Sequence, residues 1–105
     1  MNGKLVTYFG FAIRARKAVF GVDDIDAVRK GVCLIAIDAS LGESSKKTVQ
    51  KSRERLGCPI LVTPAGVLGE YLHKPAVKAV AIKDKNLALA IVREAENEQD
   101  LTVQQ

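Results

Sequence analysis

Three short apolar runs constrain the fold more than any other feature of this sequence. They occupy residues 32–37, 59–62 and 77–82, and the first two contain no charged residue. Continuous apolar runs of this length, bounded by turn residues, are typical of strands that are covered on both faces. Segments with helical patterns separate the runs, which favours an α/β protein over an all-β protein or a helical bundle.

Helical patterns fill the segments between and around these runs. Leu5, Phe9 and Ala12, for example, recur at the spacing of a single helical face. We therefore expect a three-layer α/β/α sandwich around a four-strand mixed sheet. In chain order the expected elements are helix 3–14, strand 18–20, a short helix capped by Asp23 or Asp24 and ending before Gly31, strand 32–37, helix 44–56, strand 59–62, helix 64–74, strand 77–82 and a last helix capped by Asp84.

The chain is long enough for one hydrophobic core. Its 105 residues fit a single domain, which we place at residues 1–96, and we expect residues 97–105 to form a polar acidic tail. No stretch is apolar enough to span a membrane, and no leader pattern opens the sequence. Cys33 and Cys58 each lie in an apolar run, as small hydrophobes do in a reducing compartment. These features predict a cytoplasmic protein.

The charge of the chain is unevenly distributed. The net charge is +4 overall, but residues 93–105 carry four acids and one base. Residues 1–92 therefore hold 15 bases against 8 acids. A basic body suggests a polyanionic partner. From charge alone, a basic surface that serves only solubility has equal weight as an interpretation.

The sequence holds few residues that could perform catalysis. No glycine-rich nucleotide loop follows a strand, and residues 42–46 lack the spacing of a phosphate-binding loop. His73 is the only histidine, so with two cysteines a zinc site is nearly excluded. Asp38, at the end of an apolar run, is the best catalytic candidate, but we expect it to cap the following turn. We predict a protein that is not an enzyme and has neither cofactor nor metal.

A resemblance to a known family covers nearly the whole chain, to about Val92. Residues 14–21 (RARKAVFG), 28–31 (VRKG) and 34–40 (LIAIDAS) together resemble the kink-turn RNA-binding ribosomal-protein family, that of ribosomal proteins L-seven-Ae and L-thirty-e. The likeness is closest to the small bacterial members of that family. It implies an α/β/α sandwich that binds structured RNA, either ribosomal RNA or another kink-turn RNA, and that is associated with the ribosome or translation.

The resemblance also implies which residues face the RNA. In that family a glycine corner and the start of the following helix read sheared G·A pairs, and a loop after the third strand packs against a flipped-out nucleotide. Neighbouring basic residues lie near phosphates. Carried over, the RNA-binding residues are Arg14, Arg16, Lys17, Gly21, Asp23, Asp24, Lys46, Lys47, Thr63, Pro64, Ala65 and Gly66.

Two other functions remain open alongside RNA binding. Asp23 and Asp24 stand where the family usually carries Asn-Glu or Lys-Gln, and they favour a protein-interaction module that has lost kink-turn recognition. A small α/β enzyme or nucleotide-binding domain ranks third, because it needs a cofactor loop or an acid–base pair. Non-catalytic RNA binding ranks first.

Overall fold

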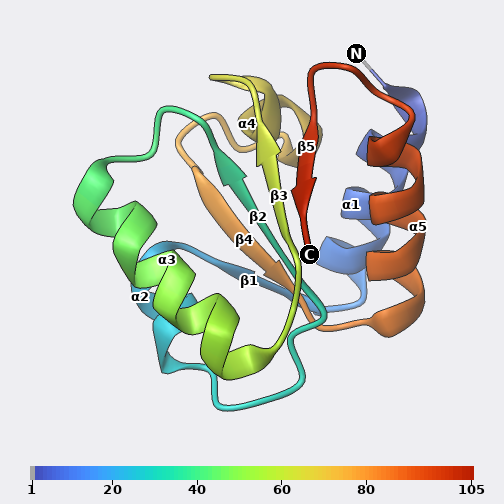
Figure 1. Ribbon diagram of the computed structural model, residues 1–105. Helices are drawn as coiled ribbons and strands as arrows, with labels where there is room; N and C mark the ends of the chain where they lie inside the picture. The colour runs from blue at the N-terminus through green and yellow to red at the C-terminus, as the bar shows by residue number, and fades with distance from the viewer. Residues whose placement is uncertain (1) are drawn as a thin grey trace.

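The computed structural model describes residues 2–105 and shows a mixed α/β fold, in which five helices surround one five-strand mixed sheet (Figure 1). Met1, the first residue of the predicted domain, lies outside the described residues. The elements are α1 (Gly3–Arg14), β1 (Ala18–Phe20), α2 (Val22–Ala27), β2 (Leu34–Asp38), α3 (Glu43–Leu56), β3 (Ile60–Thr63), α4 (Val67–Leu72), β4 (Ala79–Ile82), α5 (Lys85–Glu96) and β5 (Thr102–Gln104).

The order of the strands in the sheet is β1-β4-β2-β3-β5. β2 and β3 are parallel, while β4 is antiparallel to both of its neighbours and β5 is antiparallel to β3. It follows that β1, β2 and β3 run in the same direction. We call the end of the sheet where these three strands finish, and where β4 and β5 begin, the carboxyl end. The opposite end is the amino end.

Helices cover both faces of the sheet. In β2, Leu34 and Ala36 belong to the hydrophobic cluster formed with α1, α4 and α5, whereas Ile35 and Ile37 belong to the cluster formed with α2 and α3. Figure 1 shows α2 and α3 on one side of the strands and α1 and α5 on the other. All five residues of β2 are buried, which confirms the prediction of a strand covered on both faces.

Most predicted elements are confirmed, but the starts of α2 and α4 are different. The sequence predicts helix 64–74, whereas α4 begins at Val67 with Gly66 as its N-cap. Helix 3–14, strand 18–20 and the Asp84 cap, whose side chain accepts from the Leu87 N–H at 2.9 Å, are as predicted. In α2 the N-cap is Gly21, with no side-chain cap, and the helix ends at Ala27. The prediction that Asp23 or Asp24 caps this helix is wrong, because the chain leaves β1 through a positive-φ glycine and both acids fall in the first turn.

The predicted acidic tail is part of the sheet. Leu101 is buried in the cluster beneath α1 and α5, and Thr102–Gln104 pairs with β3 as the edge strand β5. The sheet accordingly has five strands, and the prediction of four was wrong. The strand escaped notice because it has only three residues and follows four acids, so its alternation of polar and apolar residues is too short to recognise.

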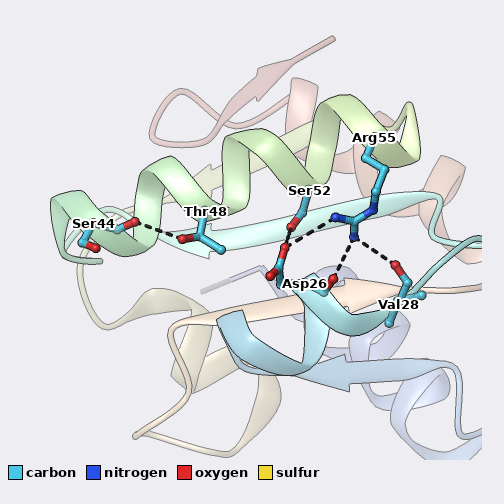
Figure 2. Close-up of polar contacts among 6 residues, drawn as sticks. All are labelled: Asp26, Val28, Ser44, Thr48, Ser52 and Arg55. Atoms are coloured by element: carbon cyan, nitrogen blue, oxygen red, sulfur yellow. Dashed lines mark hydrogen bonds and ion pairs between the residues drawn. The ribbon is translucent and has the colours of Figure 1, made fainter.

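Two side chains of α3 hold α2 against it (Figure 2). Arg55 donates to the backbone carbonyls of Asp26 at 3.1 Å and Val28 at 2.9 Å, where α2 ends. Ser52, which is fully buried, donates to the Asp26 carboxylate at 3.1 Å. A guanidinium at a helix carboxyl terminus satisfies the last carbonyls and interacts favourably with the helix dipole. These contacts stabilise a helix of only six residues.

Candidate nucleic-acid interface

The glycine corner after β1 lies at the carboxyl end of the sheet. Gly21 has φ of 90°, and its N–H donates to the Ala79 carbonyl of β4 at 2.9 Å. A Cβ placed on Gly21 would meet no atom within 4 Å, so its outer side is open to a partner. Asp23 and Asp24 are exposed beside it. The corner therefore presents bare backbone flanked by two carboxylates.

The loop after β3 reaches the same end of the sheet, but its first residue is inaccessible. Thr63 is fully buried, and its hydroxyl donates to the Ile37 carbonyl at 3.0 Å. Its side chain completes the β2–β3 packing and cannot contact RNA, which corrects its inclusion in the predicted set. Pro64 is half-buried, and Ala65 and Gly66 are exposed.

A buried carboxylate fixes the shape of this loop. Asp38, only 2% exposed, accepts hydrogen bonds from the backbone N–H of Ser40 at 2.8 Å, the Ser40 hydroxyl at 2.6 Å and the backbone N–H of Gly66 at 2.7 Å. Burial alone would raise the pKa of Asp38, but the hydrogen bonds from Ser40 and Gly66, with the charge of Lys78, lower the pKa below its usual value. The predicted capping of the turn is confirmed, and Asp38 also ties the loop after β2 to the loop after β3.

The segment between α4 and β4 forms the rest of this surface. The Lys74 ammonium lies 5.3 Å from the centre of the Phe20 ring at the end of β1. Pro75 packs so closely on Gly69 that a Cβ there would lie 3.0 Å from the Pro75 Cα. A shallow hollow of about 560 Å³ lies here, lined by Gly66, Gly69, Glu70, His73 and Pro75. We define the carboxyl-end surface as Gly21, Asp23, Asp24, Ala65, Gly66, Lys74 and Lys78.

Lys74 and Lys78 were missed by the sequence analysis. β4 is inserted between β1 and β2 and runs against both of them, so its beginning lies beside their ends. The sequence indicates that residues 77–82 form a strand, but neither its neighbours nor its direction. One feature of the sequence could have pointed to Lys78. A lysine at the start of an apolar run marks the point where the strand reaches solvent.

Three predicted RNA-binding residues lie at the other end of the sheet. Arg14 ends α1, Arg16 and Lys17 follow it in the turn before β1, and all three are exposed. The Lys17 carbonyl accepts from the Lys83 N–H at 2.7 Å, at the far end of β4. The resemblance implies that these three residues lie near backbone phosphates, and β1 separates them from the Gly21 corner.

The basic residues of α3 differ in their availability. Lys46 forms an ion pair with Glu43 at 3.7 Å, while Lys47 is exposed. Arg53 donates to the carbonyls of Cys58 at 3.2 Å and Gln104 at 3.3 Å, and also to that of Gln105, so it fastens β5 to the end of α3. With Arg55 holding α2, both arginines are engaged in the fold. Fewer basic side chains of α3 are therefore available to a partner than its sequence suggests.

One titratable side chain of α4 borders a further hollow of the molecule. Tyr71 borders a hollow of about 440 Å³, and burial, followed by the carboxylates of Glu98, Glu70 and Asp100, raises its pKa. Among residues 2–105, no group of three or more histidine, cysteine or carboxylate side chains is placed to hold a metal ion. Across the same residues, no helix has the length and apolar character needed to cross a membrane.

The two cysteines are free thiols in different settings. Cys58 is buried, and burial raises the pKa of its thiol. Cys33 is only half-buried, so the expectation that both are core residues holds for Cys58 alone. A thiol with a raised pKa is a poor nucleophile, which agrees with a packing role for Cys58.

The fold defines a mixed α/β protein, and comparison with solved structures shows that this fold is shared. No protein-family model and no curated protein matches the chain. A solved structure titled as a protein with unknown function from Bacillus halodurans is similar, with a TM-score of 0.71 and 21% sequence identity, over 88% of this chain and 96% of that chain. At this identity the likeness shows a shared fold alone.

Proposed function

We propose that this protein binds structured RNA without catalysis, through the carboxyl-end surface. The observation that carries the proposal is the position of the glycine corner and the Ala65–Gly66 loop. These are the two segments that the family resemblance assigns to RNA, and both lie at the end where β1, β2 and β3 finish. Structured RNA is recognised through its shape and its splayed bases, which suits a surface of fixed loops.

The fixed geometry of this end supports the same proposal. Asp38 holds Gly66 by accepting a hydrogen bond from its backbone N–H, and Gly21 is anchored to β4 through its own N–H. Loops positioned before binding lose less conformational entropy when a partner docks. Lys74 and Lys78 add the positive charge that phosphate groups require.

The proposal includes the finer features implied by the family resemblance. We infer an α/β/α sandwich, which the two hydrophobic clusters on opposite faces of the sheet support. We also infer a cytoplasmic protein whose RNA is ribosomal or contains a kink-turn, with the ribosome as a partner. The two free thiols fit a reducing compartment.

Titration with a fluorescent kink-turn RNA tests this function. The control RNA has its tandem G·A pairs replaced by Watson–Crick pairs. We expect tight binding that is lost with the control, and a severalfold loss of affinity in Lys78→Gln at the carboxyl-end surface. Lys51→Gln, an exposed lysine of α3, is the matched control and should bind as the unaltered protein does. Equal affinity for both RNAs would contradict specific recognition of a kink-turn.

The second candidate is a protein-interaction module on the same scaffold. Its support is the exposed pair Asp23 and Asp24, which oppose phosphate at the corner. Asp23→Ala and Asp24→Ala separate the two functions. If the acids read base amino groups, these variants change the preference between RNAs. If the protein has lost RNA recognition, neither RNA binds before or after substitution.

A further inference from the structure

Basic side chains from three separate turns meet at the amino end of the sheet. These turns are residues 14–17 before β1, residues 29–33 before β2 and residues 83–85 after β4. All three lie toward the lower part of the view in Figure 1. We define the basic end as the seven bases that they carry, all exposed: Arg14, Arg16, Lys17, Arg29, Lys30, Lys83 and Lys85.

Backbone contacts hold the three turns together. Lys83 donates its N–H to the Lys17 carbonyl at 2.7 Å, and Cys33 donates to the Ile82 carbonyl at 2.8 Å. The Lys83 Cε lies 3.7 Å from where a Gly31 Cβ would be. The three segments that carry these basic residues therefore lie side by side, although up to about seventy positions separate the residues in the sequence.

The charge of this surface is almost uncompensated. The three turns contain a single carboxylate, Asp84, and it accepts the Leu87 N–H as the cap of α5. Seven bases and one acid give a net charge of +6, more than the +4 of the entire chain. Within residues 2–105, the ion pairs are Lys46–Glu43 and Arg55–Asp26, so none involves the basic end. Clustered and unpaired positive charge is typical of a polyanion-binding surface.

An exposed aromatic ring adjoins this charge. Phe11 is 45% exposed on α1, one turn before Arg14, whose guanidinium carbon lies 5.0 Å from the ring centre. Unpaired nucleic-acid bases stack on aromatic rings and on guanidinium planes. The Phe11 ring, with the Arg14 guanidinium and the six other basic side chains of this end, therefore favours a nucleic acid with unpaired nucleobases over a uniform anionic surface.

We propose that the basic end is a second RNA-binding surface for an unpaired RNA segment. The phosphates of this segment contact the lysine and arginine side chains, and one nucleobase stacks against Phe11 and Arg14. With the carboxyl-end surface it bridges two RNA segments, and this bridging rests on the proposed function. The two surfaces face away from each other, and a five-residue strand such as β2 alone spans about 17 Å between them. A straight RNA helix that lies on one end does not reach the other.

Fluorescence anisotropy with a labelled twelve-nucleotide oligouridine tests the basic end, at about 150 mM salt so that distant charges are screened. We expect Lys17→Glu/Lys83→Glu to weaken binding at least tenfold and to make its salt dependence shallower. Each lost phosphate contact lowers the slope by about 0.7 for a single strand. The matched control, Lys74→Glu/Lys78→Glu, changes the same charge at the carboxyl end and should bind oligouridine normally.

Substitution of the aromatic ring separates stacking from charge. Phe11→Ala should weaken oligouridine binding about tenfold, while Phe11→Tyr retains it, because only the first removes the ring. Circular dichroism tests whether each variant is folded. If Lys17→Glu/Lys83→Glu is not folded, Lys17→Gln/Lys83→Gln takes its place. Unchanged oligouridine affinity in the basic-end variants, or an equal loss in the carboxyl-end control, would overturn the proposal. Binding to anionic vesicles without binding to oligouridine would overturn it as well.

Energy transfer between donor-labelled oligouridine and acceptor-labelled kink-turn RNA then tests the bridge. Transfer on one protein molecule supports it, and competition between the two RNAs overturns it. The two proposals fail in different ways. If oligouridine binds at the basic end and no kink-turn RNA binds, the proposed function is wrong and the second surface stands. If only the kink-turn RNA binds, the second surface is wrong.

Discussion

The two ends of the sheet are built on different principles. At the carboxyl end, Asp38 is buried and its hydrogen bonds fix two loops, while Gly21 and Gly66 both adopt positive φ. At the basic end the side chains are exposed, and positive charge is what its seven residues share. The first end presents a defined shape and the second a concentrated charge. Shape can recognise one RNA structure, whereas charge attracts phosphates of any sequence.

The basic residues also fall into two groups, those that hold the fold together and those that are free for a partner. Arg53 and Arg55 are counted among the charges of α3, yet each is hydrogen-bonded to backbone carbonyls of a neighbouring segment. Lys17 and Lys30 are exposed and free of ion pairs among residues 2–105. Net charge alone therefore does not identify a binding surface, since the engaged bases serve the fold.

The largest effect is expected from removal of the buried carboxylate at the carboxyl end. Asp38→Ala leaves the N–H groups of Ser40 and Gly66 without their charged acceptor. Hydrogen bonds to charged groups contribute about 1.5–3 kcal/mol each, so we expect a loss of about 4 kcal/mol in the free energy of unfolding. Urea denaturation measures it. Ser40→Ala, which removes only the hydroxyl contact at an exposed position, is the control and should cost about 1.5 kcal/mol, the lower end of this range.

The lowered pKa of Asp38 also makes the free energy of unfolding decrease at acidic pH. We call this decrease the acid limb of the stability curve. The folded protein holds this carboxyl ionised below its usual pKa of 3.8, so the contribution is complete above that pH and is lost as the pH falls toward the lower folded value. Asp38→Asn should flatten this limb below about pH 4, where the carboxyl of the unfolded chain takes up its proton. An unchanged acid limb in Asp38→Asn would show that other carboxylates produce it.

The next effect comes from the tight contact beneath the Lys74–Pro75 segment. In Gly69→Ala the new Cβ meets the Pro75 backbone at 3.0 and 3.1 Å and the Lys74 carbonyl oxygen at 3.2 Å. Backbone atoms cannot move aside as a flexible side chain can, so we expect a loss of about 2 kcal/mol. Kink-turn affinity should fall as Lys74 shifts, with oligouridine affinity unchanged. Gly3→Ala, where no atom lies within 4 Å, is the control and should be neutral or slightly stabilising.

A smaller loss is expected at the glycine corner, where conformation and not space is limiting. Gly21 has φ of 90° and ψ of 149°, a region almost restricted to glycine. Gly21→Ala should cost about 1–2 kcal/mol, although nothing lies within 4 Å of the new Cβ. Gly42→Ala is a matched control, because Gly42 caps a helix with φ of −63° and equal space. Equal stability of the two variants, measured by thermal denaturation, would contradict a strained corner.

The sequence predicts the elements of both ends better than their arrangement. Apolar periodicity located helix 3–14 and the core strands, because burial on two faces leaves a local signal. The insertion of β4 between β1 and β2 has no local signal, since strand pairing depends on contacts distant in sequence. That insertion places Lys78 beside the Gly21 corner and Lys83 beside Lys17. The division of the basic residues between two ends could thus be seen only in three dimensions.

The smallest effect distinguishes a base that serves the fold from one that is free for a partner. Arg55 donates to the last carbonyls of α2, but its side chain is 42% exposed, so solvent screening reduces the contribution of its ion pair with Asp26. We expect Arg55→Ala to lower the free energy of unfolding by about 1 kcal/mol, mainly through the two hydrogen bonds to carbonyls. Lys17→Ala at the basic end should leave stability within about 0.5 kcal/mol of the original value and should weaken oligouridine binding instead. The two variants remove the same charge from the same end of the sheet. Two results would contradict this distinction. One is a loss of stability in Lys17→Ala, and the other is a loss of oligouridine affinity in Arg55→Ala as large as that in Lys17→Ala. Either would show that hydrogen-bonded and free basic residues at this end contribute alike to folding and to binding.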